Sequence, residues 1–129
     1  MREEINATTE AIIGAAIAVH RELGPGLLES AYEACLEYEL LSRGYDVQRQ
    51  LELPVNYRGV KVDAGFRIDL LVNGLVIVEL KAVEKLERIH EAQLHTYLRL
   101  TGLHAGLLMN FNVVRLVDGL KRIVRNLPE

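Results

Sequence analysis

The stretch that decides the fold runs from Phe66 to Lys81 and reads FRIDLLVNGLVIVELK. Two apolar segments flank Asn73-Gly74, a dipeptide typical of the turn in a β-hairpin. The segments are apolar on both faces, as expected of a sheet that helices cover on both sides. Four charged residues interrupt them: Arg67, Asp69, Glu79 and Lys81. We therefore predict a hairpin, residues 65–72 and 75–83, that carries charged side chains inside a buried sheet.

The length of the turn decides whether these charges meet. Period-two alternation places Glu79 and Lys81 on one face of their strand. A two-residue turn pairs Asp69 with Val78 and puts Asp69 on the wrong face, whereas a three-residue turn or a one-residue bulge pairs it with Glu79. Two carboxylates about 4 Å apart repel by roughly 4 kcal/mol at an effective dielectric of 20. Such a pair needs a cation, partly Lys81 and partly a divalent ion; otherwise Glu79 and Lys81 form a solvated edge and Asp69 is a turn or capping residue.

Elements on both sides of the hairpin set the fold class. Glycines end each of three apolar patterns of helical period, at Gly24, Gly44 and Gly102. The predicted order is α-α-β-β-β-β-α-β-β, which indicates an α/β sandwich around a mixed sheet flanked by helices. The predicted helices span about 5–23, 28–40 and 87–100, and the other strands 46–57, 60–64 and 105–109, followed by a hairpin or short helix over 113–124.

Composition narrows the functional classes. The 129 residues fit a single domain, 1–129. A net charge of −3 argues against nucleic-acid binding by bulk charge alone. No apolar run approaches the roughly 20 residues of a membrane span, and the acidic start is unlike a signal peptide, so we expect a cytoplasmic protein that does not bind membranes. The lone Cys35, expected to be a small buried hydrophobe, excludes an internal disulfide, and the four histidines lack zinc-ligand spacing.

The charged hairpin resembles a known motif. Asp69 followed by Glu79-Leu80-Lys81 is similar to the motif of the PD-(D/E)XK nucleases, with Ile68 in place of the proline. Residues 26–32 match the Gly-x-x-Glu-x-x-Tyr signature of a group of small bacterial proteins placed in that superfamily. The segments 20–26 and 110–112 also resemble that group.

The resemblance implies a restriction-endonuclease-like fold and a metal-dependent nuclease acting on nucleic acid, with DNA as the expected substrate. In that family the two acidic side chains and the intervening backbone carbonyl, here Asp69, Glu79 and Leu80, bind Mg²⁺, for which Mn²⁺ is expected to substitute. Lys81 activates or positions the attacking water. Glu29 completes the metal site by the same pattern; alternatively, it is an acidic residue favoured by the dipole in the first turn of a helix.

Other residues are expected to touch substrate. Gln93 and Tyr97 form an i, i+4 pair on one helical face and resemble the Gln-x-x-x-Tyr element of RecB-like and λ-exonuclease-like members, which contacts substrate. His90 lies one turn earlier and is expected on the same face. Tyr32, the tyrosine of the Gly-x-x-Glu-x-x-Tyr signature, is also assigned to substrate binding.

Two other functions stay open from the sequence. A catalytically inactive binding or assembly module that keeps the nuclease fold agrees with the acidic net charge and the small size. A structural protein in which Glu79 and Lys81 form an internal ion pair needs no metal. The sequence also leaves open whether the chain forms a homo-oligomer.

Overall fold

A mixed five-stranded sheet forms the middle layer of the molecule. The computed structural model describes all 129 residues. The strand order is β1-β4-β5-β6-β7, with β5 and β6 parallel and every other neighbouring pair antiparallel. These strands are β1 Val47–Glu52, β4 Arg67–Val72, β5 Val76–Lys81, β6 Ala105–Asn110 and β7 Leu120–Val124.

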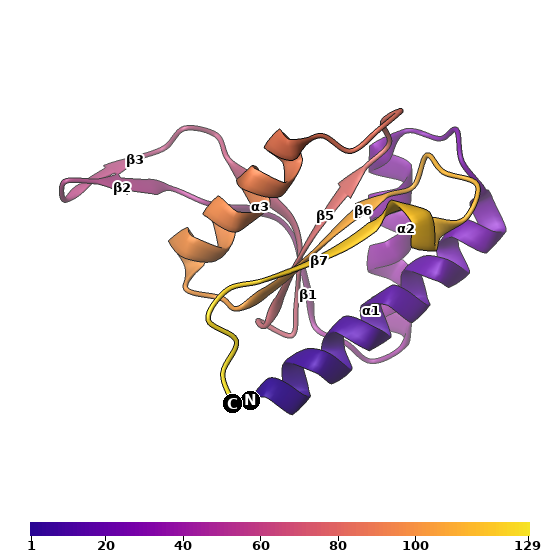
Figure 1. Cartoon of the computed structure of the whole chain (residues 1–129), viewed down its shortest axis with the longest axis horizontal. Coiled ribbons are helices and arrows are strands. Elements are labelled where there is room, and N and C mark those ends of the chain that lie inside the picture. Colours follow the sequence, from indigo (N-terminus) through magenta and orange to yellow (C-terminus); the bar gives the residue numbers. More distant parts are fainter.

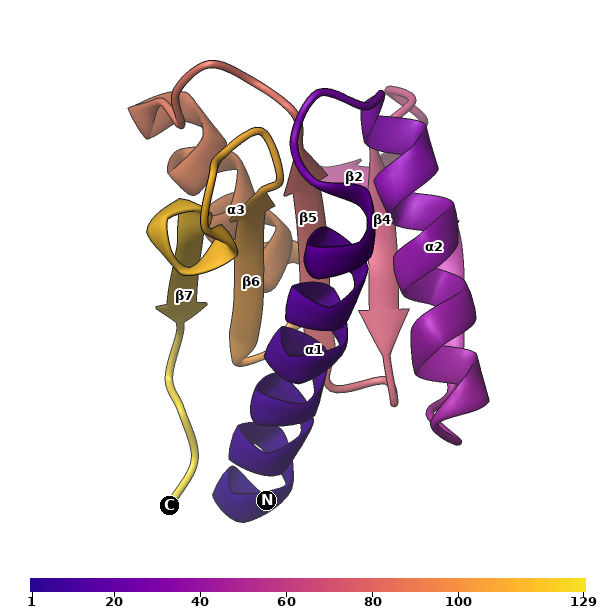
Figure 2. The same ribbon diagram turned by 90° about the vertical axis from the view of Figure 1, so that its right-hand side faces the viewer.

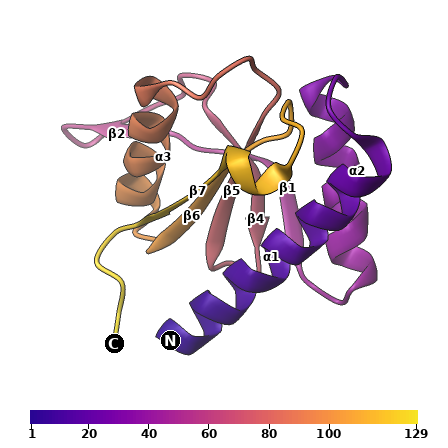
Figure 3. The ribbon, with the colours of Figure 1, turned by 45° about the vertical axis from the view of Figure 1, so that its right-hand side comes forward.

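Helices cover both faces of this sheet. Helices α1 (Arg2–Leu23) and α2 (Glu29–Ser42) lie on one face, and α3 (Arg88–Thr101) lies on the other (Figures 2 and 3). Their apolar stripes bury two clusters, 18 residues on the α1/α2 side and 9 on the α3 side. This arrangement confirms the predicted α/β sandwich with a mixed sheet flanked by helices. None of the helices has the length and hydrophobicity needed to cross a membrane.

The three helices end where the sequence predicts. Gly44 and Gly102 have φ values of 90° and 73°, a left-handed conformation that glycine adopts without steric cost. After α2, Gly44 N donates to Leu41 O and Tyr45 N to Leu40 O, the two bonds of a Schellman motif. The loop after α1 turns the chain so that α2 lies beside α1, and both helices pack on the same face of the sheet (Figure 2).

The prediction of one continuous strand over residues 46–57 is wrong. The strand ends before Leu53-Pro54, because proline has no N–H to donate to a sheet. The second part, β2 (Val55–Tyr57), pairs instead with β3 (Val60–Val62) in a separate two-stranded sheet. This β2–β3 arm extends away from the main sheet, alongside α3 (Figure 1).

The segment predicted as a hairpin or short helix over residues 113–124 contains both kinds of structure. A 3₁₀ helix, η1 (Leu116–Gly119), leads into β7, which pairs antiparallel with β6. The chain then returns to its start, where Arg2 Nε donates to Pro128 O at 2.9 Å. The two termini therefore lie side by side (Figure 1).

Candidate active site

The hairpin register brings Asp69 opposite Glu79. Strands β4 and β5 pair Val72 with Val76 and Leu70 with Val78, so the turn between them has three residues. Asn73 and Gly74 adopt φ values of 54° and 64° in that turn. Continuing the same register by one residue sets Asp69 against Glu79. The three-residue alternative from the sequence is therefore the correct one.

The two carboxylates replace main-chain pairing at this position. Asp69 N donates to Glu79 Oε2 at 2.8 Å, and Leu80 N donates to Asp69 Oδ2 at 2.9 Å. Each side chain thus reaches across to the backbone of the other strand. The remaining oxygens are Asp69 Oδ1, with one contact at 3.3 Å from Gln50 Nε2, and Glu79 Oε1. Both carboxylates are held in place while keeping an oxygen for another partner.

A local distortion of β4 accompanies this arrangement. Ile68 packs in the α3-side cluster, whereas Leu70 packs in the α1/α2-side cluster. In a regular strand, side chains two residues apart point to the same face of the sheet. Ile68 and Leu70 point to opposite faces, so the strand changes orientation at Asp69. Opposite Asp69 on β1, Gln50 has a φ of 54°. Its neighbours Arg49 and Leu51 pair with Leu70 and Ile68 of β4, whereas Gln50 interrupts this pairing. A non-glycine residue in this region is strained, and such strain concentrates at functional sites.

Burial makes the pair hard to ionise. Glu79 is only 5% exposed. Burial, followed by the charge of Asp69, raises the pKa of Glu79 to about 8. Burial is also the main cause that raises the pKa of Asp69 to about 6, and the charges of Glu33 and Glu29 add to it. Without a cation, the pair therefore retains a proton near neutral pH.

Lys81 acts on the pair at a distance. It is half-buried at the end of β5, and its charge lowers the pKa of both Asp69 and Glu79. It forms no ion pair with either carboxylate, since the six ion pairs of the chain involve other residues. The structural alternative, an internal Glu79–Lys81 ion pair, therefore has no support in the geometry.

The segment after β6 holds the end of β5. Phe111 N donates to Lys81 O at 2.9 Å. The buried Asn110 side chain accepts from Val83 N at 3.1 Å and donates to Val83 O at 2.9 Å. The asparagine noted in the sequence thus anchors the chain just beyond the Glu79–Lys81 segment.

Helix α2 contributes two acidic residues beside Asp69. Glu29 is exposed in its first turn, and Glu33 is buried one turn later. Glu33 accepts from Arg49 Nε at 3.0 Å and from Gln50 Nε2, which also contacts Asp69. A cavity of about 370 Å³ is lined by Glu29, Glu33, Gln50 and Asp69. The sequence analysis missed Glu33 and Gln50, although the i, i+4 spacing of Glu29 and Glu33 places them on one helical face.

Tyr32 occupies a different place from the one expected. It is fully buried, its ring stacks on Phe111 at 4.6 Å, and its hydroxyl donates to Gly24 O and accepts from Leu27 N. Because every polar group of this side chain is used inside the protein, it offers no surface to a substrate. We therefore replace the expected substrate contact with a structural one: Tyr32 holds the loop between α1 and α2.

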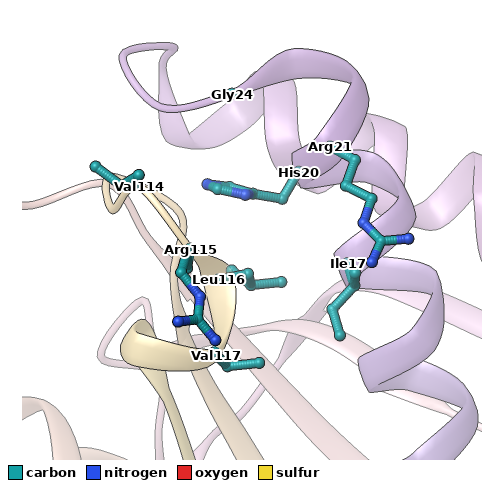
Figure 4. Close-up of a pocket in the computed structure, with 8 residues that line it drawn as sticks. All are labelled: Ile17, His20, Arg21, Gly24, Val114, Arg115, Leu116 and Val117. Carbon is teal, nitrogen blue, oxygen red and sulfur yellow. The ribbon is translucent and has the colours of Figure 1, made fainter.

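His20 anchors the neighbouring loop. Its Nε2 lies 2.8 Å from Val113 O and 3.2 Å from Phe111 O. A cavity of about 390 Å³ beside it lies between the end of α1 and residues 114–117, with Arg21 and Arg115 at its walls (Figure 4). None of the site residues expected from the sequence lines this cavity, so it is separate from the carboxylate site.

The three residues expected on α3 do share one cavity. His90, Gln93 and Tyr97 line a groove of about 550 Å³ between α3 and the base of the β2–β3 arm, here called the α3 groove. His90 Nδ1 also accepts from Glu87 N at the start of the helix. Burial raises the pKa of Tyr97 to about 12, and the charges of Glu79 and Asp69 contribute further. Tyr97 therefore lines the groove and is close enough to the carboxylate pair for their charges to act on it.

The donor set fits a hard divalent ion. Mg²⁺ in proteins is typically held by one or two carboxylates, with water or substrate phosphate as the remaining ligands. Asp69 and Glu79 provide two carboxylates, and burial raises the pKa of both because their charged forms are poorly solvated. The exposed Glu29 does not join them closely, since no three acidic, histidine or cysteine side chains converge on one point. The residues present therefore support two protein carboxylates rather than three.

Comparison with known proteins gives the family. A search of the curated proteins and a search of the solved structures each found no match. The family model described as the PD-(D/E)XK nuclease superfamily matches residues 6–123. Members of this superfamily typically use divalent metal ions. The match covers nearly the whole chain, from within α1 to Ile123 in β7, and includes Asp69, Glu79 and Lys81, so the chain belongs to the PD-(D/E)XK nuclease superfamily.

Proposed function

We propose that this chain is a metal-dependent nuclease that hydrolyses phosphodiester bonds in DNA, with residues 1–129 acting as one domain. The observation that carries the proposal is the pair formed by the half-buried Asp69 and the buried Glu79, in which each carboxylate bonds the backbone of the other strand. Residues that serve only stability rarely include two poorly solvated acids side by side without a cation, because their repulsion destabilises the fold. The Gly26, Glu29 and Tyr32 spacing supports assignment to the Gly-x-x-Glu-x-x-Tyr group.

In the proposed site, Asp69, Glu79 and the backbone carbonyl of Leu80 hold the ion, expected to be Mg²⁺ with Mn²⁺ as a substitute. When bound, the ion supplies Lewis acidity toward the phosphate and lowers the pKa of a bound water. Glu29 is exposed and lines the adjoining cavity with Asp69, and it would add a further negative charge beside a bound ion.

The protein's own residues orient the reaction. The oxygen of a water attacks phosphorus as the water gives up a proton, the bond from phosphorus to the leaving oxygen breaks, and the leaving oxygen takes up a proton. Lys81 carries a positive charge on the same strand face as Glu79 and has no ion-pair partner. It is therefore free to orient the attacking water or to stabilise negative charge on the phosphate. Gln93, Tyr97 and His90 contact the substrate from the α3 groove.

A nuclease assay with Mn²⁺ tests this function. We expect the wild type to cut plasmid or single-stranded circular DNA and Lys81→Ala to lose about 100-fold or more in rate, because removing one stabilising charge from a reacting centre typically has this effect. Lys121→Ala is the matched control, since Lys121 only forms an exposed ion pair with Glu91. If wild type and both variants are equally inactive while still binding DNA, the binding or assembly module, favoured by the net charge of −3, replaces the nuclease.

A further inference from the structure

The α3 groove has walls unlike those of a phosphate site. Its exposed apolar side chains include Phe66, which is 41% exposed, and Ile89, which is 68% exposed. The ring of Phe66 meets Tyr97 nearly edge-on, with centroids 6.3 Å apart. Six of the ten residues that line the groove are apolar, and Arg99 is the only arginine or lysine among them. The groove therefore suits a flat, mostly apolar group better than an anion.

A nucleobase has the matching chemistry. Its faces stack on aromatic and apolar side chains, and its edge carries hydrogen-bonding groups. At the groove, Phe66 and Ile89 offer apolar surface, and the half-buried Gln93 offers one amide donor and one amide acceptor. These groups come from the segment just before β4 and from α3, and the charges of Asp69 and Glu79 act on Tyr97 in the same groove.

Basic side chains at the groove and on the neighbouring arm favour a polyanion there. Arg99 lines the α3 groove, and Arg58 and Lys61 lie on the β2–β3 arm. None of these three forms an ion pair. They are available to the phosphates of a strand whose base enters the groove.

We propose that the α3 groove holds one unpaired nucleobase of the strand being cut, so that the substrate is single-stranded or locally unpaired DNA. This inference rests on the proposed nuclease function. A base inside an intact duplex is stacked and paired and reaches such a pocket only after unstacking. The groove thus selects for unpaired strands, while Asp69 and Glu79 provide the reacting centre.

Fluorescence anisotropy in a chelating buffer separates this inference from cleavage. The probes are a labelled single-stranded 12-mer, the same strand with abasic sites throughout, and a blunt-ended hairpin duplex. We expect Phe66→Ala to weaken binding of the single strand about tenfold, the usual effect of losing one base-stacking contact. Phe66→Tyr should restore binding, and Ile89→Asp should weaken it. Val114→Ala, at an exposed apolar residue of another surface, should bind as wild type.

The abasic strand and the duplex give the opposing outcomes. Both should bind the wild type more weakly than the normal single strand and should not respond to Phe66→Ala. Equal affinity for the normal and abasic strands, or an equal effect of Phe66→Ala on the duplex, would overturn the base pocket. If the protein cleaves DNA in Mn²⁺ but binds the normal and abasic strands equally, only the base pocket is ruled out. If it binds the normal strand more tightly but cleaves no DNA, the nuclease function is ruled out and a single-strand binding site remains.

Discussion

At the scale of single residues, the charge of Glu33 bears on the protonation of Asp69. Glu33 is 6% exposed on α2 and bonds Arg49 and Gln50. After burial and the backbone bond, its charge is the next largest influence on Asp69, and it raises the pKa of that carboxyl. Glu33 therefore acts on the proposed metal ligand from a helix on the opposite side of the sheet from α3.

This arrangement predicts a shifted pH profile for Glu33→Gln. Removing the negative charge should lower the pKa of Asp69, and metal binding needs the deprotonated carboxylate. Mn²⁺ affinity measured by calorimetry between pH 5 and 8 should therefore persist to lower pH than in the wild type. Glu37→Gln is the matched control, because Glu37 also pairs with Arg49 but is not among the charges acting on Asp69. Equal shifts in both variants would assign the effect to Arg49 instead.

The hydroxyl of Tyr32 gives a second prediction at this scale. Tyr32→Phe leaves Leu27 N and Gly24 O without their partner, which should lower the free energy of unfolding by about 1–2 kcal/mol. The melting temperature should fall, and the KM for DNA should stay at its wild-type value. Tyr38→Phe, on the same helix but 76% exposed, should change neither quantity. A raised KM with an unchanged melting temperature would return Tyr32 to the substrate site.

At the scale of elements, the turn between β4 and β5 fixes the register of the site. Asn73 has a φ of 54°, its N donates to Asp46 O at 2.8 Å, and its Oδ1 accepts from Asp46 N at 2.9 Å. The turn is thus tied to the loop before β1. This three-residue turn and its tie keep Asp69 opposite Glu79 rather than opposite Val78.

Two substitutions at Asn73 separate the backbone from the side chain. Asn73→Gly loses the side-chain bond to Asp46 N, and we expect it to lower the free energy of unfolding by about 1 kcal/mol. Asn73→Ala loses the same bond and keeps a β-carbon in the left-handed region without the polar side chain that lets asparagine adopt it, so we expect it to be about 1 kcal/mol less stable than the glycine variant. Urea denaturation of the two variants measures both values. If alanine is as stable as glycine at this position, the positive φ is not maintained in solution.

The elements also show what the sequence could predict. Helical periodicity and the three terminal glycines predicted α1, α2 and α3, because each glycine stops a pattern that is apolar on one side. Alternation in the hairpin left two turn lengths open, since the tie between Asn73 and Asp46 spans 27 residues and no local pattern contains it. The change of face at Asp69 likewise depends on Gln50 in another strand. The role of Glu33 was not predicted, because it depends on contacts with Gln50 and Asp69, which are distant in sequence.

At the scale of the whole molecule, the carboxylate pair couples stability to pH. The pKa of Asp69 is raised to about 6 and that of Glu79 to about 8, whereas both are near 4 in an unfolded chain. Between about pH 4 and pH 8 the native state therefore binds more protons than the unfolded state, and the free energy of unfolding falls as the pH rises. Urea midpoints measured in a chelating buffer should decrease from pH 5 to pH 9. A midpoint that rises over this range would show that the pair is ionised and compensated in the metal-free protein.

A divalent ion should reverse this loss of stability. An ion that binds only the native state stabilises it by about 2.7 kcal/mol at a hundredfold excess over Kd, so millimolar Mn²⁺ should raise the melting temperature by several degrees at pH 8. Asp69→Asn should abolish the response while leaving the metal-free protein at least as stable as wild type at that pH, because one of the two repelling charges is gone. Asp118→Asn, at an exposed acid of η1, should keep the full response.

A purely structural carboxylate pair predicts the opposite results. The melting temperature of the wild type would not change with Mn²⁺, and Asp69→Asn would melt at a lower temperature because the carboxylate that bonds Leu80 N is removed. Differential scanning fluorimetry of the three proteins, with and without Mn²⁺, therefore decides between a metal site and a purely structural pair.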